Sequence, residues 1–339
     1  MITYRNLNVH KKERRAEFDV HPRRHQRWTG RSARGGCPSV DGPNSILFIL
    51  FVISFLISGC SSPRAARRID AELDRNAAAA KSAYSSGSLT NADLFYQKAL
   101  NRARLTDQGI DIARLAYNLA VCRAQTQKYA EALKLLDEAG FESEQTGLYM
   151  PEIQLLKAEI LFQLGQTGEA IAVADSGLKA SQNQKDKLAT LQFHLFLAEL
   201  ACGRNDAAQA LKELDKIDQK ALAEAPLIIQ ARTARARGRA LSVDKRFAEA
   251  ANCFDNAAAL YRQAQRYPEM AAGLADAGNA CESAMNRRAA LDRYYRAARS
   301  LLACGENAKG LESFNKAKTL AAELQDKKMT EALARLQGE

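Results

Sequence analysis

Residues that build metal centres, redox motifs and phosphate-binding loops are scarce in this sequence. Of its 339 residues, four are histidine and one is tryptophan, and beyond Cys60 only His194 remains of these. The five cysteines that follow Cys60 show no CxxC pairing or metal-ligand spacing. The sequence also has no glycine-rich phosphate loop. These absences predict a protein that is not an enzyme and that binds no metal, cofactor or small-molecule substrate.

Glycine and proline are sparse as well, with 19 and 7 residues. Alanine is abundant, as in the stretch ALAEAPLIIQARTARARGRAL. Because alanine loses no side-chain entropy in a helix, this balance favours an all-α protein. Hydrophobic residues make up 47% of the chain and charged residues 26%, which are ordinary values for a folded body.

The positive charge is concentrated near the N-terminus. Residues 1–59 hold ten Lys or Arg and four Asp or Glu, so they carry +6 of the net charge of +10. The rest of the chain is therefore only mildly basic. This distribution predicts no nucleic-acid partner once the first segment is removed.

A single uncharged apolar run of twelve residues, Ile46 to Ile57, leads to a cysteine. A membrane-spanning helix needs about 20 apolar residues, so this run is short for a span and suits a signal-peptide core. The run ends in LISGC, which resembles the lipobox of bacterial lipoproteins. That resemblance implies cleavage after Gly59 and acylation of Cys60, with a covalent lipid as the anchor. The alternative is a short uncleaved anchor with a chance cysteine at its end.

The residue after the cysteine is Ser61, not the aspartate that resembles an inner-membrane retention signal. We therefore expect an outer-membrane lipoprotein on the periplasmic side. Residues 1–44 are longer and more mixed than a signal-peptide start, and either an over-extended gene start or a long cytoplasmic leader explains them. The predicted organisation is a removed leader and signal peptide (1–59), a lipidated N-terminus and linker (60–70), a folded body (71–325) and a C-terminal tail (326–339).

A weak pattern recurs about every 40 residues in the folded body. Small residues open the second helix of each predicted helical hairpin, and they are Ala92, Ala132, Ala170, Ala210, Ala250 and Ala290. The stretch 116–139 gives nearly a whole unit, with Tyr129 just ahead of one of these alanines. Small residues at such positions let two helices approach closely. Pro151, Pro226 and Pro268 each lie at or just before a predicted first helix, where a missing N–H costs little.

This pattern resembles tetratricopeptide (TPR) repeats in a longer variant, since the commonest repeat has 34 residues. The resemblance implies an all-α solenoid of about six helical hairpins over residues 75–300. Residues 306–325 are predicted to form the C-terminal capping helix. Unrelated helical hairpins are the alternative. In this register most of the cysteines replace small apolar residues, which predicts buried free thiols, with a disulfide as the alternative. His194 has no second ligand nearby and is predicted to be structural.

The resemblance also implies a concave groove lined by certain positions of each first helix, where partner peptides bind. The residues at these positions are Arg114, Tyr117, Glu152, Glu159, Gln192, Glu199, Arg232, Arg235, Arg239, Asn279 and Glu282. The three arginines follow i, i+3, i+7 spacing and share one stripe of a helix. Such a stripe suits a carboxylate, because each guanidinium offers paired donors. The alternative is a solvated charged face.

The sequence thus predicts a lipid-anchored adaptor that binds a protein or peptide partner and contacts the membrane through its lipid. The alternative function is a structural or assembly subunit of a secretion, pilus or other envelope complex.

Overall fold

The computed structural model describes residues 70–338, and every regular element in this part of the chain is a helix. Gly59, Cys60 and the apolar run before them lie outside the described residues, so the lipid anchor stays a prediction. Among the helices that are described, none is both long enough and apolar enough to cross a bilayer.

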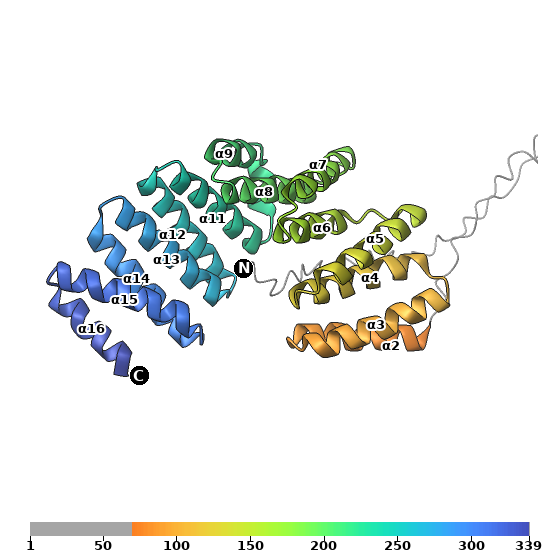
Figure 1. Ribbon diagram of the computed structural model, residues 1–339, viewed down its shortest axis with the longest axis horizontal. Helices are drawn as coiled ribbons and strands as arrows, with labels where there is room; N and C mark the ends of the chain where they lie inside the picture. The colour runs from red at the N-terminus through yellow and green to blue at the C-terminus, as the bar shows by residue number, and fades with distance from the viewer. Residues whose placement is uncertain (1–69, 339) are drawn as a thin grey trace, which may run out of the picture. The chain divides into compact units, whose positions relative to one another are not determined.

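The helices follow one another in chain order and pack mainly against their sequence neighbours (Figure 1). Their bounds are α2 Ala71–Ser85, α3 Leu89–Leu105, α4 Gly109–Gln125, α5 Tyr129–Thr146, α6 Pro151–Gln163, α7 Thr167–Asn183, α8 Lys187–Gly203, α9 Ala207–Asp215, α10 Gln219–Glu224, α11 Leu227–Val243, α12 Phe247–Gln263, α13 Tyr267–Ser283, α14 Arg287–Ala303, α15 Asn307–Glu323 and α16 Lys327–Gly338. We call α2, α4, α6, α8, α11 and α13 the first helices of the hairpins, and α3, α5, α7, α9, α12 and α14 the second helices. The predicted all-α solenoid of about six hairpins is confirmed.

The turns between helices are short and repeat one backbone geometry. In most of them one residue has a positive φ, as Asp107 (51°), Gln127 (61°) and Met285 (59°) do. The next residue's N–H then bonds back to the helix that has just ended, for example Gln108 N to the carbonyl of Ala103 at 3.0 Å. This is the Schellman pattern that stops a helix and reverses the chain. The repeated turn therefore ends most of the helices in the same way and reverses the chain into the next one.

Small residues at the predicted positions form the centres of the hairpins. Full burial, with 0% exposure, is shared by Ala92, Ala132, Ala170, Ala210, Ala250 and Ala290. Glycines mark close approaches between helices, because an added Cβ would lie 2.2 Å from the Phe193 ring at Gly177, 2.8 Å from the Phe254 ring at Gly238 and 2.7 Å from the Tyr294 ring at Gly278. Such distances are too short for any side chain, so the small residues set the spacing between helices.

Two elements depart from the predicted pattern. A short extra helix, α10, follows the shortened α9, and Pro226 caps the start of α11. At the C-terminus, residues 306–325 contain α15 as predicted, but the chain continues into α16, where Leu333 is only 2% exposed. The segment assigned as a tail is therefore helical over Lys327–Gly338 and closes the solenoid together with α15.

The cysteines follow the prediction in part. Cys122, Cys202 and Cys281 are buried, Cys253 is half-buried and Cys304 is exposed at the end of α14. Burial raises the pKa of the Cys122 thiol to about 12, so this thiol stays protonated at neutral pH.

Candidate functional site

The residues predicted to line a groove lie on five first helices: α4, α6, α8, α11 and α13. Helix α4 contacts α6, α6 contacts α8, and α8 contacts α11. Neighbouring hairpins therefore bring their first helices side by side, as the TPR register predicts. We call the surface carried by these five helices the first-helix face.

The structure brings three of the predicted residues together at the centre of this face. Arg232 of α11 donates two hydrogen bonds to Glu199 of α8, from Nη2 to Oε2 at 2.8 Å and from Nε to Oε1 at 3.4 Å. Its Nη2 also lies 3.9 Å from Oε1 of Glu159 on α6. We call these three residues the Arg232 cluster. It joins three consecutive hairpins through one guanidinium.

The electrostatics of the cluster follow from its burial. Glu159 is 6% exposed, and burial raises the pKa of its carboxyl to about 7, with Glu199 adding to the rise and Arg232 opposing it. Burial works in the opposite sense on Arg232, but the carboxylates of Glu199 and Glu159 outweigh it and raise the pKa of the guanidinium. Arg232 therefore stays charged, while Glu159 titrates near neutral pH.

The other two arginines of the predicted stripe differ from each other. Arg235 is paired with Asp276 of α13, with both Nε and Nη2 2.8 Å from Oδ2. Arg239 is exposed, and no carboxylate within the described part of the chain pairs with it. A partner's carboxylate could therefore bind Arg239 directly. At Arg232 and Arg235 it would compete with the acids of the chain itself. The clamp stays a prediction, centred now on Arg239.

The remaining predicted residues divide between the two ends of the face. In the N-terminal part, burial raises the pKa of the Tyr117 hydroxyl, and the nearby charge of Glu152 adds to the rise. In the C-terminal part, the Tyr294 hydroxyl contacts Asn279 Oδ1 and Glu282 Oε2, both at 2.7 Å. These last two side chains therefore help to hold α13 against α14.

Two further predicted residues make no hydrogen bond or ion pair that the described chain shows. Arg114 of α4 is exposed, and Gln192 of α8 is half-buried. Both donors remain available to a partner on the first-helix face.

Sequence reasoning missed Asp276 and Tyr294 as partners of predicted residues. Asp276 lies 41 residues after Arg235, close to one repeat further along the chain. The repeat length was therefore the signal that could have identified this pair.

His194 has a structural contact, as predicted. Its Nδ1 lies 2.9 Å from Oε2 of Glu213, which also accepts a hydrogen bond from Lys216 at 2.7 Å. The contact of His194 with Glu213 fixes α8 against α9, and the contact of Lys216 with Glu213 lies at the end of α9. No group of three or more His, Cys, Asp or Glu side chains arranged to hold a metal occurs among residues 70–338.

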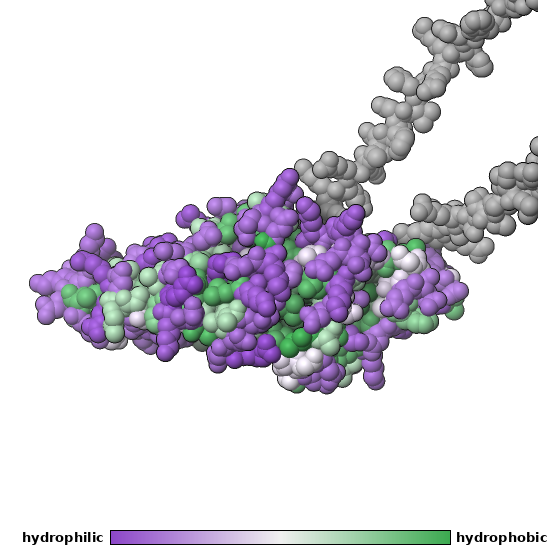
Figure 2. Space-filling view, turned by 90° about the horizontal axis from the view of Figure 1, so that it is seen from above, coloured by the Kyte–Doolittle hydropathy of each residue, from purple (hydrophilic) through white to green (hydrophobic). Residues whose placement is uncertain are grey.

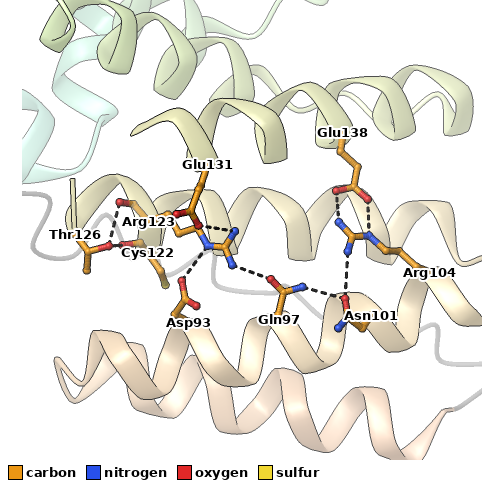
Figure 3. Close-up of polar contacts among 9 residues, drawn as sticks. All are labelled: Asp93, Gln97, Asn101, Arg104, Cys122, Arg123, Thr126, Glu131 and Glu138. Carbon is orange, nitrogen blue, oxygen red and sulfur yellow. Dashed lines mark hydrogen bonds and ion pairs between the residues drawn. The ribbon is translucent and has the colours of Figure 1, made fainter. Parts of the chain in front are cut away.

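A second polar network lies on the N-terminal hairpins and is centred on Arg123 of α4 (Figure 3). The guanidinium of Arg123 reaches Asp93 at 3.1 Å and Gln97 at 2.8 Å on α3, and Glu131 at 3.2 Å on α5. The donors of this guanidinium thus bind acceptors on two neighbouring helices. The arrangement ties α3, α4 and α5 together.

The same network continues along α3 to Arg104 (Figure 3). Gln97 donates to Asn101, which also accepts a hydrogen bond from Arg104 at 3.1 Å. Arg104 then binds both carboxylate oxygens of Glu138 on α5, at 2.7 and 2.6 Å. Both arginines of this network are bound within the chain, so the network serves to hold hairpins together and is a weaker candidate for a partner site.

The surface view agrees with a polar exterior. On the face shown in Figure 2, hydrophilic residues cover most of the described surface, and hydrophobic residues appear between them in smaller areas. The exposed large hydrophobic side chains include Leu105, Phe141 and Met285, which lie on different helices or turns. Charged groups therefore provide the more specific candidates for recognition.

Comparisons with known proteins bear on the fold. No protein-family model matches the sequence, and no curated protein matches it significantly. Among solved structures, the apo form of RapI is 9% identical with a TM-score of 0.57, covering 78% of this chain and 74% of its own. NprR in complex with its cognate peptide NprX is 10% identical with a TM-score of 0.52, covering 86% and 83%. A tetratricopeptide repeat protein from Parabacteroides merdae ATCC 43184 is 16% identical with a TM-score of 0.45, covering 80% and 100%.

The described residues form a TPR-like α-solenoid. At these identities the similarity concerns the fold alone. Within the described residues, the fully buried alanines from Ala92 to Ala290 recur at intervals of 38 or 40 residues.

Proposed function

We propose that the protein is a lipid-anchored, non-catalytic adaptor that binds a partner protein on its first-helix face, on the periplasmic side of a bacterial outer membrane. The observation that carries the proposal is the row of charged side chains on this face, with the exposed Arg239 two helical turns from the Arg232 cluster. Support for binding also comes from NprR, a similar fold that was solved with a peptide.

The charges of the first-helix face favour a partner that presents a carboxylate. No acid among residues 70–338 pairs with the Arg239 guanidinium, and the Arg235 side chain is still 34% exposed beside Asp276. A guanidinium matches two carboxylate oxygens with two parallel hydrogen bonds. An acidic side chain or a C-terminal carboxylate can therefore bind at Arg239 and share Arg235.

The support for membrane anchoring is the sequence LISGC, which ends at Cys60. Two or more acyl chains hold a protein on a bilayer far more firmly than one does, since each buried methylene adds about 0.8 kcal/mol. An adaptor anchored in this way would keep its partner close to the membrane. Replacing Cys60 with Ala should release the protein from the membrane fraction or leave an unprocessed precursor.

Two variants of α11 test the binding face. Arg239→Glu reverses an exposed charge on the first-helix face, and Arg237→Glu makes the same change where the arginine pairs instead with Asp215 of α9, at 2.8 Å. Envelope complexes of the wild type and of each variant are crosslinked mildly. The amount of each protein captured by a variant is then compared with the amount captured by the wild type. Arg239→Glu should reduce capture of the partner by about tenfold, while Arg237→Glu should leave it within about twofold.

Equal losses for the two variants would show that the overall field of the protein attracts the partner. No loss in either would place the contact elsewhere and favour a structural subunit of an envelope complex. Either result would overturn the proposed site.

A further inference from the structure

A hollow of about 300 Å³ lies among α12, α13 and α14, away from the Arg232 cluster. Its floor is apolar and contains Ala258, Met270 and Leu274. Three arginines line it as well, namely Arg262 of α12 and Arg296 and Arg299 of α14, and all three are exposed. One acid, Asp255 of α12, also lines the hollow, and its carboxylate is bound by Arg293. The hollow thus combines an apolar base with a rim in which the cations outnumber the one paired acid.

The charge of α14 is unusual for this chain. The helix carries five arginines and a single acid, Asp292. Four of the five arginines have a carboxylate nearby: Arg287 is 3.5 Å from Glu323, Arg288 is 3.6 Å from Asp326, Arg293 binds Asp255 and Arg296 is 3.3 Å from Asp292.

Arg299 differs from these four. Its guanidinium lies over the Tyr295 ring, 5.6 Å from the centroid, and within the described residues no carboxylate pairs with it. Arg262 of α12, which also lines the hollow, likewise has no carboxylate partner within the described residues. Arg262 and Arg299, neither of which has an acid partner in residues 70–338, therefore line the same hollow.

We propose that this hollow is a second protein-binding site, which takes an acidic peptide segment carrying an apolar side chain. A carboxylate would bind the guanidinium groups of Arg262 and Arg299, whose paired donors match its two oxygens. The neighbouring apolar side chain would cover Met270, which is half-buried. A bare phosphate or a lipid headgroup would use the cationic rim but would gain nothing from the apolar floor.

The site goes beyond the proposed adaptor face because it uses second helices as well as α13. A protein with both sites could hold two partners, or two segments of one partner, at separate places along the solenoid. The volume is at the lower end of the range for ligand pockets, which suits a few side chains.

The test is fluorescence anisotropy with the full chain in detergent micelles and a labelled hexapeptide of alternating Glu and Leu. The double variant Arg262→Gln/Arg299→Gln should weaken peptide affinity about tenfold, because two charge-assisted contacts are lost. The matched control is Arg287→Gln/Arg288→Gln, which removes the same charge from exposed positions and should change affinity less than twofold. Arg239→Glu should also leave this affinity unchanged, so the result is separate from the proposed first-helix site.

Specificity is measured with a Gln–Leu peptide, inorganic phosphate and phosphatidylglycerol vesicles as competitors. The Gln–Leu peptide should compete at least tenfold less well than the Glu–Leu peptide, and phosphate and vesicles should compete weakly. The proposal is overturned by absence of saturable binding to the wild type, or by equal losses in the two double variants. It is also overturned if phosphate or vesicles compete as well as the acidic peptide does, because the site would then recognise anions in general.

Discussion

The middle of the solenoid, α6 to α11, and the C-terminal run, α12 to α16, are built from the same kind of hairpin but bury different groups. In the run, α12, α13, α14 and α15 each have 17 residues, and Ser313 is the one buried polar side chain among the residues described there. In the middle, α6 has 13 residues, α9 has 9 and α10 has 6. Glu159, His194 and Glu213 are buried there.

This difference shows that two regions of one repeat protein can be held together by different interactions. Regular helices joined by one type of turn need only small residues at fixed places to pack. A buried charge, by contrast, needs a partner at a defined position, and its removal leaves the other charge unpaired. We infer that the irregular middle is fixed by polar contacts and that the C-terminal run is fixed by close packing.

The largest expected effect is the loss of the central guanidinium. Arg232→Leu leaves Glu199 and Glu159 without their cation and should lower the free energy of unfolding by about 3–5 kcal/mol at pH 8. Arg293→Leu in the regular run should cost about 1 kcal/mol or less, because Asp255 is 30% exposed and water can solvate it. Urea unfolding of both variants measures the two losses. Equal losses would remove the distinction between the two regions.

The next effect is a pH dependence confined to the middle. The folded pKa of Glu159, about 7, lies above its ordinary value of 4.5, so the folded state holds this proton more tightly than the unfolded chain does. The contribution is fully present below pH 4.5 and is lost as the pH rises to about 7, by about 3 kcal/mol. Glu159→Gln should remove this fall from the pH profile of unfolding.

The control for the titration is Glu249→Gln on α12. Hydrogen bonding to Arg246 lowers the pKa of this exposed carboxyl. Glu249→Gln therefore removes one carboxylate charge, as Glu159→Gln does, but should leave unchanged the fall in the free energy of unfolding above pH 4.5. If both variants keep the wild-type profile between pH 4.5 and 7, Glu159 does not titrate there.

Overpacking should affect both regions alike, since both use the same small residues. Ala170→Leu in the middle and Ala290→Leu in the run place a large side chain at positions with 0% exposure, at a cost of about 1–3 kcal/mol each. Lys212→Leu and Gln263→Leu, at exposed positions, should be nearly silent. Thermal melting compares the four variants. Indistinguishable melting temperatures would contradict the repeat register.

The smallest effect concerns the turns of the regular run. Met285 has a φ of 59° and its side chain is exposed, so Met285→Gly should stabilise the fold by up to about 1 kcal/mol through relief of backbone strain. Gly305 has a φ of 77°, and Gly305→Ala should destabilise by about 1 kcal/mol. Chemical denaturation of the pair gives changes of opposite sign if the positive φ at these turn positions strains a residue that carries a side chain. A loss for Met285→Gly would show that its side chain supports the turn.

Much of the fold could be predicted from the sequence because the packing depends on side-chain size at regular intervals. The alanines from Ala92 to Ala290 and the position of Pro226 determine the hairpins and their register. Helix α10 was missed although Asp218 marks its start, with an oxygen accepting hydrogen bonds from the Lys220 and Ala221 N–H groups. A helix of 6 residues is too short to show a periodic pattern.

The candidate site could be predicted only as a set of positions. The spacing of Arg232 and Arg235 places them on one side of α11, but their acids come from other hairpins, 33 and 41 residues away. Which acid reaches which arginine depends on how neighbouring hairpins are rotated against each other. That rotation is a property of the packed helices and is not visible in the spacing of residues along one helix.

The most direct test of the central claim is site-specific photo-crosslinking of the full chain in its native envelope. A photoreactive amino acid replaces Gln192 or Arg114 on the first-helix face, and Lys212 or Gln263 on second helices serves as the comparison. We expect one partner to be captured from both first-helix positions and from neither second-helix position. Capture of that partner mainly from Lys212 or Gln263, with none from Gln192 or Arg114, would contradict it.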